Sequence, residues 1–266
     1  MATQIVAGKG FDHRVFTQHT LPNDSLHIYI EGDGSPWIGG NTVAADPTPR
    51  NPLALRLMAK SPYNSVYIGR PCYFDQITTK LCEPRYWTSA RYSEAVVNSM
   101  LAVIERLRLQ GQRLVLIGYS GGATLATLLT ERLDGDLVLI TVAGNLDIDR
   151  WTSHHGYLPL HESLNPAKTV SLKGVRHMHL AAEHDRVIPK EQIKSFAKSH
   201  GGEFQVFESY NHRCCWLEHW PDLLKTLLAE DKYFPQTTSA SDKHWVRQSI
   251  VSQHHVPKAA AVGSQE

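Results

Sequence analysis

Residues 114–133 constrain the fold of this chain more than any other segment. Four consecutive apolar residues, LVLI at 114–117, lead directly into the turn Gly118-Tyr119-Ser120-Gly121-Gly122, and an apolar helical pattern then continues to residue 133. A short, wholly apolar run is typical of a parallel strand that is covered on both faces. The segment therefore predicts a central strand, a sharp turn and a helix, which is the repeating unit of an α/β domain.

The rest of the chain continues this alternation. Further strands are predicted at residues 26–30, 65–69, 137–142, 175–182 and 204–207, and helices at 51–60, 92–109, 190–198 and 216–228. Asn51 is the expected cap of the first helix, with Pro52 in its first turn. The pattern predicts an α/β fold with a mostly parallel central sheet and helices on both faces. We expect one domain over residues 1–234, since α/β domains often reach this size.

Two long segments, 70–89 and 145–173, lack clear periodicity and are rich in Pro, Trp, Tyr and His. Loops of this length are usually functional or disordered, and the aromatic content argues against disorder. We therefore expect pocket-forming loops and a loop-rich lid over the site. Their aromatic side chains predict a partly apolar pocket: Tyr73, Phe74, Tyr86, Trp87, Trp151 and Tyr157. Residues 235–266 lose the apolar pattern and are predicted to form a mobile tail.

Composition and charge narrow the possible partners. The formal net charge is +1 over 266 residues and no long basic block occurs, so no nucleic-acid partner is predicted. No apolar run is long enough for a membrane span or a secretory signal, which leads us to expect a cytoplasmic protein, although a secreted mature form would look the same. The sequence does not predict an oligomeric state.

The four cysteines have no C-x-x-C spacing, and no metal site or other cofactor is predicted. The pairs His154-His155 and His254-His255 do not have the spacing of a defined metal site either. Cys72 and Cys82 flank a short loop and are close enough in sequence to pair in an oxidising environment, whereas a bond between the adjacent Cys214 and Cys215 would be strained. We favour free thiols, because scaffolds that depend on disulfides are much shorter than this chain.

The turn at 118–122 matches G-x-S-x-G in the strand–turn–helix setting that a nucleophile elbow requires. Such a turn holds the serine, here Ser120, in a strained conformation, and Gly118 and Gly122 remove side chains that would collide across it. The amides at the start of the following helix would face an oxyanion formed above Ser120. The alternative is a packing turn in which Ser120 only caps the helix.

A serine nucleophile needs a base, and the base needs a group that orients it. His212 follows the last predicted strand and Asp185 follows the one before it, so both lie at the edge of a parallel sheet where Ser120 lies. The chain order Ser…Asp…His also fits. Alternatively, Asp185 caps a helix or pairs with Arg186, and His212 is a surface turn residue. The rival acids and bases are Asp147, Asp149, His154, His155 and His219.

Acyl transfer also needs amides that bind the developing oxyanion. We expect one from Gly121 and the other from Asp33, in the Gly-rich turn Glu31-Gly32-Asp33-Gly34. Gly34 is an alternative donor. The other alternative is that this Gly-rich turn has no catalytic role. Gly34, Trp37 and Tyr119 are the predicted substrate-binding residues.

These motifs together resemble the α/β-hydrolase superfamily over about residues 26–228. The resemblance rests on GYSGG, on EHDRVIP around Asp185, on YNH at His212 and on EGDG at Asp33. It implies a mostly parallel sheet of the eight-stranded type and a Ser–His–Asp triad that needs no metal or organic cofactor. One departure is that Glu31-Gly32 stands where many members have His-Gly. The strings AGNLD, HGYLPL and SLNP within 143–166 are similar to poorly characterised bacterial members.

The resemblance implies a serine hydrolase that cleaves an ester or thioester of a small-molecule acyl substrate through an acyl-enzyme. Amide cleavage is possible on the same residues. Two alternatives stay open, since fold does not fix function. One is an acyltransferase that passes the acyl group to an alcohol, and the other is a non-catalytic binding protein with the same fold.

Overall fold

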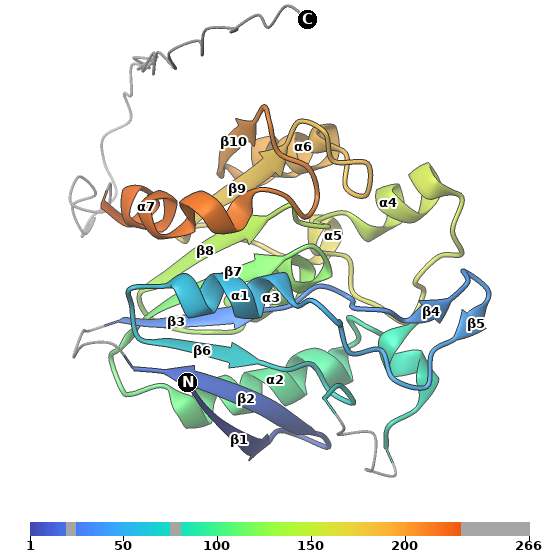
Figure 1. Cartoon of the computed structure of the whole chain (residues 1–266), viewed down its shortest axis with the longest axis horizontal. Helices are drawn as coiled ribbons and strands as arrows, with labels where there is room; N and C mark the ends of the chain where they lie inside the picture. Colours follow the sequence, from blue (N-terminus) through green and yellow to red (C-terminus); the bar gives the residue numbers. More distant parts are fainter. Residues whose placement is uncertain (20–24, 75–80, 230–266) are drawn as a thin grey trace, which may run out of the picture. The chain divides into compact units, whose positions relative to one another are not determined.

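A computed structural model describes residues 1–19, 25–74 and 81–229 (Figure 1). Its main feature is an eight-stranded sheet in which β3 (Ser25–Ile30) lies between β6 (Ser65–Ile68) and β7 (Arg113–Tyr119). Beyond β7 follow β8 (Leu137–Val142), β9 (Arg176–Ala182) and β10 (Glu203–Phe207), and all neighbours from β6 to β10 pair in parallel. At the other edge, β1 (Ala2–Ala7) and β2 (Asp12–Gln18) are antiparallel to their neighbours. The predicted α/β fold with a mostly parallel sheet is confirmed.

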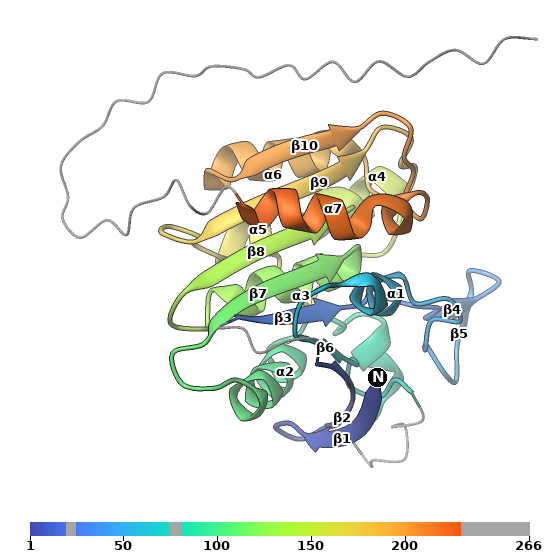
Figure 2. The ribbon, with the colours of Figure 1, turned by 60° about the vertical axis from the view of Figure 1, so that its left-hand side comes forward.

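Helices cover both faces of this sheet (Figures 1 and 2). On one face, α2 (Glu94–Leu107), α3 (Gly121–Thr130) and α6 (Lys190–His200) share a buried apolar cluster with Ile28, Ile30, Leu114 and Leu116 of the strands. On the other face lie α1 (Leu53–Lys60) and α7 (Trp216–Ala229). There the indole N–H of Trp220 donates to the Tyr29 hydroxyl over 3.2 Å. The apolar run at 114–117 is buried along its whole length, as a central strand requires.

The N-terminal hairpin was not predicted. β1 is exposed at five of its six residues, so it carries no apolar alternation that the sequence could reveal. The predicted cap at Asn51 is also wrong, because α1 begins after Pro52 and has no side-chain cap at that position. A small two-stranded sheet of β4 (Trp37–Ile38) and β5 (Thr42–Val43) completes the strands.

The two long segments are not entirely loops. Residues 145–173 contain α4 (Ile148–His155) and the short α5 (Pro166–Thr169), and residues 70–89 contain the 3-10 turn η2 (Pro84–Trp87). The side chain of Asp147 caps α4 and Gly156 ends it with a φ of 65°. Asn165 caps α5 in the same way. Both capping residues are visible in the sequence, but the short helices that follow them lack a long apolar period.

Residues Met1–Leu227 form one compact unit. Of the second unit, Leu228–Glu266, only residues 228 and 229 are described. The predicted tail at 235–266 lies outside the described residues, as do 230–234 of the expected domain. No helix in the described part of the chain is long and apolar enough to cross a bilayer.

The preference for free thiols is wrong for this structure. Cys72 is bonded to Cys82, with their Cα atoms 5.5 Å apart, and Cys214 is bonded to Cys215. Cys72 is completely buried in a small cluster with Phe11, Tyr73 and Trp87. The short loop between Cys72 and Cys82 allowed this pairing, whereas chain length was a poor guide to it.

Candidate active site

Ser120 lies between the end of β7 and the start of α3, with φ 53° and ψ −121°. The glycines on either side make this turn possible. A Cβ at Gly118 would lie 2.5 Å from the Cα of Ala123, and a Cβ at Gly122 would lie 2.2 Å from the carbonyl oxygen of Ile30. The amide of Ser120 donates to Val142 on the neighbouring strand over 3.0 Å. The turn therefore has the strain and the close backbone approach expected of a nucleophile elbow.

The structure brings the three predicted triad residues together. The Nε2 atom of His212 is 3.1 Å from the Oγ of Ser120, and its Nδ1 is 2.8 Å from Oδ2 of Asp185. The other carboxylate oxygen of Asp185 accepts the amide hydrogens of Val187 and Ile188, each over 2.8 Å. Because the Asp185 side chain is fully buried and bonded at both oxygens, the imidazole is held in one orientation.

The rival acids and bases have other roles. Asp147 and Asp149 both accept hydrogen bonds from the side chain of Asn165 at the start of α5. His155 donates to the carbonyl of Val187 over 2.8 Å, and its ring stacks on Tyr157. The exposed His154 and His219 have no described hydrogen bond to Ser120 or Asp185.

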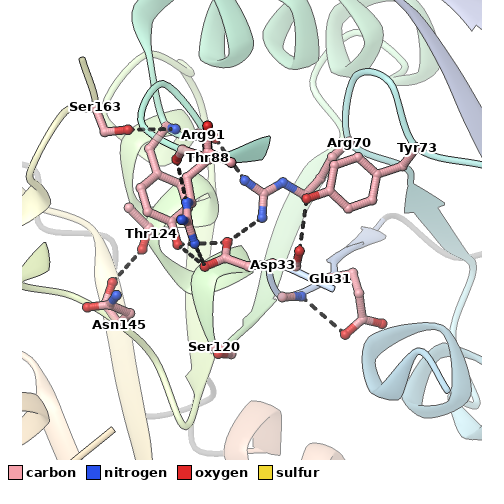
Figure 3. A network of polar contacts seen from close by, with 12 residues as sticks. Glu31, Asp33, Arg70, Tyr73, Thr88, Arg91, Ser120, Thr124, Asn145 and Ser163 are labelled. Carbon is pink, nitrogen blue, oxygen red and sulfur yellow. Dashed lines mark hydrogen bonds and ion pairs between the residues drawn. The ribbon is translucent and has the colours of Figure 1, made fainter. Parts of the chain in front are cut away.

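Asp33 is the centre of a buried ionic network (Figure 3). One carboxylate oxygen is 2.5 Å from Nη1 of Arg70 and the other is 2.9 Å from Nη1 of Arg91, while the Tyr92 hydroxyl is 2.7 Å from both. Burial alone would raise the pKa of Asp33, but the charges of Arg91 and Arg70 outweigh it and lower the pKa to about 2. The backbone oxygen of Asp33 also accepts from the Tyr73 hydroxyl. This network was not predicted, since nothing in the sequence distinguishes these arginines from surface arginines.

The network holds the Asp33 turn against the nucleophile elbow. A Cβ at Gly121 would lie 2.2 Å from Oδ1 of Asp33, and a Cβ at Gly32 would lie 3.2 Å from the Cβ of Ser120. Within the described residues, neither the Asp33 amide nor the Gly121 amide donates a hydrogen bond. The two amides expected to bind an oxyanion thus lie on adjacent segments beside Ser120. Gly34, the alternative donor, has φ 66° and packs against Pro47.

Glu31, at the departure from the family pattern, is 3 % exposed and lies beneath the same turn. Its carboxylate accepts the amide hydrogens of Gly32 over 3.1 Å and of Ala54, in the first turn of α1, over 2.9 Å. Burial raises the pKa of Glu31 to about 7 against the opposing effect of these amides. Glu31 therefore replaces the missing side-chain cap of α1 and connects that helix to the turn that carries Asp33.

A cavity of about 1070 Å³ opens beside Ser120 and His212. The predicted pocket residues Gly34, Trp37 and Tyr119 all line it, and the Tyr119 ring lies 5.1 Å from that of His212. Residues 145–173 contribute much of the wall, including Trp151 and Tyr157. The segment 70–89 contributes only Thr88 and Ser89 among the described residues. The other four aromatic residues expected at the pocket are wrong: Tyr73, Phe74, Tyr86 and Trp87 pack instead in the cluster around Cys72.

The described residues include no group of three or more His, Cys, Asp or Glu side chains arranged to hold a metal ion. The arrangement at Ser120 instead suits proton transfer between a hydroxyl, an imidazole and a carboxylate.

Comparison with solved structures identifies the fold. Est1E from Butyrivibrio proteoclasticus has a TM-score of 0.64 at 11 % identity, over 87 % of this chain and 99 % of that one. An esterase from Pyrococcus furiosus has a TM-score of 0.61 at 13 % identity, with coverages of 86 % and 91 %. An alpha-beta serine hydrolase homologue from Coxiella burnetii has a TM-score of 0.60 at 15 % identity, with coverages of 86 % and 96 %.

No family model and no curated protein matches the sequence. The structural similarity nevertheless covers most of the chain, 86 % and 87 % of it in the two esterase comparisons. The chain therefore has the α/β-hydrolase fold.

Proposed function

We propose that this protein is a serine hydrolase that cleaves carboxylic esters or thioesters through an acyl-enzyme on Ser120. The observation that carries the proposal is the continuous set of hydrogen bonds from Ser120 through His212 to the buried Asp185, beside a large cavity. Solved structures with the same fold include proteins named as esterases and serine hydrolases, which supports the same reaction class.

In the first half of the reaction, Oγ of Ser120 attacks the acyl carbon and its proton moves to Nε2 of His212. Asp185 accepts the Nδ1–H of His212 and stabilises the imidazolium that forms. The amides of Gly121 and Asp33 donate to the oxyanion of the tetrahedral intermediate. When the intermediate collapses, the bond from the acyl carbon to the leaving oxygen or sulfur breaks, and the proton on Nε2 passes to that atom.

In the second half, water attacks the acyl carbon while His212 again accepts a proton. Collapse of the second intermediate breaks the bond from the acyl carbon to Oγ, returns the proton to Ser120 and releases the carboxylic acid. Each group ends the cycle in its starting state, so the reaction requires no metal or organic cofactor. The Asp33 carboxylate stays ionised and paired with its two arginines throughout.

The test is labelling with a fluorophosphonate probe, followed by mass mapping of the modified peptide. The native protein should be labelled at Ser120, and Ser120→Ala and His212→Ala should not be labelled. Ser153→Ala and His219→Ala are matched controls, because both residues are exposed and neither lines the cavity, and they should label like the native protein.

A folded native protein that resists the probe would overturn the proposal and favour a binding protein with this fold. If labelling succeeds, turnover of an ester and thioester panel identifies the bond that is cleaved. Added alcohols then distinguish hydrolysis from acyl transfer, since a transferase would form a new ester at the expense of the free acid.

A further inference from the structure

Three arginines at the cavity have no role in the proposed triad. Arg50 precedes α1, Arg56 lies in its first half, and Arg213 directly follows His212. All three line the cavity and all three are exposed. They come from two segments far apart in the sequence, so the fold is what brings them to one cavity.

These guanidinium groups have no acidic partner among the residues that the structure describes. Within the described part of the chain, no carboxylate lies within ion-pair distance of any of the three. Arg56 donates one hydrogen bond to the side chain of Asn51 over 3.0 Å, which leaves its other N–H groups for a ligand. By contrast, Arg91, which also lines the cavity, is already paired with Asp33.

The other charged groups around the cavity do not cancel this positive charge. Among its described lining residues the only carboxylates are Glu31 and Asp33. Asp33 is neutralised by two arginines, and Glu31 is buried beneath α1 with both oxygens bound by backbone amides. Three unpaired arginines in a concave site concentrate positive potential there, although the chain as a whole has a formal charge of only +1.

Arg213 connects this charge to the reaction centre. Arg213 directly follows His212 in the chain, and it lines the same cavity as Tyr119 and Ser120. Tyr119 is part of the nucleophile elbow and its ring lies against His212. An anion bound at Arg213 would therefore lie in the same cavity as an acyl group on Ser120.

We propose that Arg50, Arg56 and Arg213 form a subsite for a carboxylate or phosphate group carried by the substrate. Guanidinium groups suit both anions because their planar N–H pairs match two oxygens at once. The inference rests on the proposed function and narrows its substrate class to anionic esters. The exposed apolar side chains at the same cavity, Trp37, Tyr157 and Leu158, suit the uncharged remainder of such a substrate.

The direct test measures binding without turnover. In a full-length Ser120→Ala background, calorimetry compares 4-carboxyphenyl butanoate with its neutral isostere 4-carbamoylphenyl butanoate. The anionic ester should bind about tenfold more tightly at low salt, and higher ionic strength should weaken binding of the anionic ester but not of the neutral one.

Adding the substitutions Arg50→Gln, Arg56→Gln and Arg213→Gln should abolish this preference for the anionic ester. A control with Arg106→Gln, Lys173→Gln and Lys198→Gln removes the same charge from exposed sites outside the cavity and should keep the preference.

A third ester, 4-(phosphonooxy)phenyl butanoate, identifies which anion the subsite prefers. Equal binding of charged and neutral esters, or a preference that survives loss of the three arginines, would overturn the subsite. If Ser120→Ala prefers the anions but the native protein neither labels nor hydrolyses, the hydrolase proposal fails and the subsite stands. If the native protein labels and hydrolyses both ester types equally well, the subsite alone fails.

Discussion

At Ser120 the backbone adopts a conformation that costs a non-glycine residue about 1–3 kcal/mol. Its neighbours compensate for this cost. The amide of Ser120 donates to Val142, and its carbonyl accepts from Ala123 over 3.0 Å and from Asn145 over 3.1 Å. The carbonyl of Asn145 in turn accepts from the Thr124 hydroxyl. Strain of this kind persists only where surrounding contacts fix it, so the serine is positioned before any substrate binds.

Asp185→Asn tests the orienting role of this carboxylate. An amide cannot accept from His212 on one side and from the amides of Val187 and Ile188 on the other, so either the imidazole tautomer or the turn changes. We expect kcat to fall about 10³- to 10⁴-fold with little change in KM, measured on any ester that the native protein hydrolyses. Asp149→Asn is the control and should keep nearly full activity. A similar loss in both variants would contradict the assignment of Asp185.

Glu31→Gln tests the buried carboxyl beneath the Asp33 turn. Its pKa is about 7 in the folded protein against an ordinary value of 4.5, so between these values only the folded state keeps the proton. The stability that comes from this proton is therefore complete below pH 4.5 and is lost as the pH rises through 7. Glutamine does not titrate in this range. The free energy of unfolding of Glu31→Gln, measured in urea relative to that of the native protein, should therefore rise by on the order of 3 kcal/mol from pH 5 to pH 8.

The constant cost of losing one amide hydrogen bond in Glu31→Gln does not depend on pH, so the change with pH is the informative quantity. Glu208→Gln, at an exposed surface position, serves as the control and should show no such change. A difference between Glu31→Gln and the native protein that stays constant from pH 5 to pH 8 would show that the Glu31 carboxyl titrates normally.

At the scale of elements, the elbow between β7 and α3 depends on the space that glycine leaves. A methyl group at Gly122 would lie 2.2 Å from the carbonyl of Ile30 on β3, so Gly122→Ala requires the strand and the helix to separate. We expect at least about 2 kcal/mol of destabilisation and loss of probe labelling. At Gly111 a methyl group meets nothing within 4 Å but φ is +72°. Gly111→Ala should thus cost only about 1 kcal/mol and keep labelling. Equal costs would contradict the steric argument.

The Asp33 network connects the Asp33 turn to the segment before α2. Arg70→Met leaves the partly buried Asp33 with one guanidinium partner instead of two. Breaking a buried ion pair in this way costs about 3–5 kcal/mol, and the displaced turn should also slow probe labelling. Arg108→Met breaks a surface pair with Glu105 and should cost less than about 1 kcal/mol. Thermal unfolding and labelling rates measure both effects. A variant Arg70→Met that labels at the native rate would show that the network does not position the turn.

Sequence patterns predicted the parallel part of the sheet and missed its N-terminal edge. Strands β3, β6, β7 and β8 were predicted within a few residues, because strands buried on both faces are continuously apolar. β9 and the half-buried edge strand β10 were also predicted, from their shorter apolar stretches. β1 was missed because it is mostly exposed at the sheet edge, and α4 because its eight residues hold few apolar positions. A local pattern reports burial, so elements with little burial leave little signal.

The same distinction applies to the site. Ser120, Asp185 and His212 were predicted from their positions after three strands, since parallel topology brings such positions to one edge. Their catalytic role stays a prediction. The pairing of Asp33 with Arg70 and Arg91 spans 37 and 58 residues and depends on how loops pack, which no local pattern encodes. Because no local pattern encodes loop packing, the aromatic residues of 70–89 were wrongly assigned to the pocket. They pack beside Cys72 instead.

For the molecule as a whole, the cavity depends on segments with different kinds of support. The wall from 145–173 includes α4 and α5, which side-chain caps stabilise. The segment 70–89 has a covalent support instead, since the bond between Cys72 and Cys82 closes a loop of about ten residues. Arg70 and Tyr73, which hold Asp33, lie within two residues of Cys72 in the chain. We therefore expect the oxidation state of this pair to affect both global stability and the position of the Asp33 turn.

Removal of the Cys72–Cys82 bond tests this connection. A loop of this size constrains the unfolded chain by about 3 kcal/mol, so Cys72→Ala with Cys82→Ala should unfold at correspondingly lower urea concentration. Cys214→Ala with Cys215→Ala removes a bond that encloses no intervening residues, and it should cost much less. Reductant should lower the native protein nearly to the level of the first variant and change that variant only slightly, because only the Cys214–Cys215 bond is left in it to be reduced. If the unreduced, unfolded native protein instead reacts with a thiol reagent at all four cysteines, the thiols are free and this support is absent.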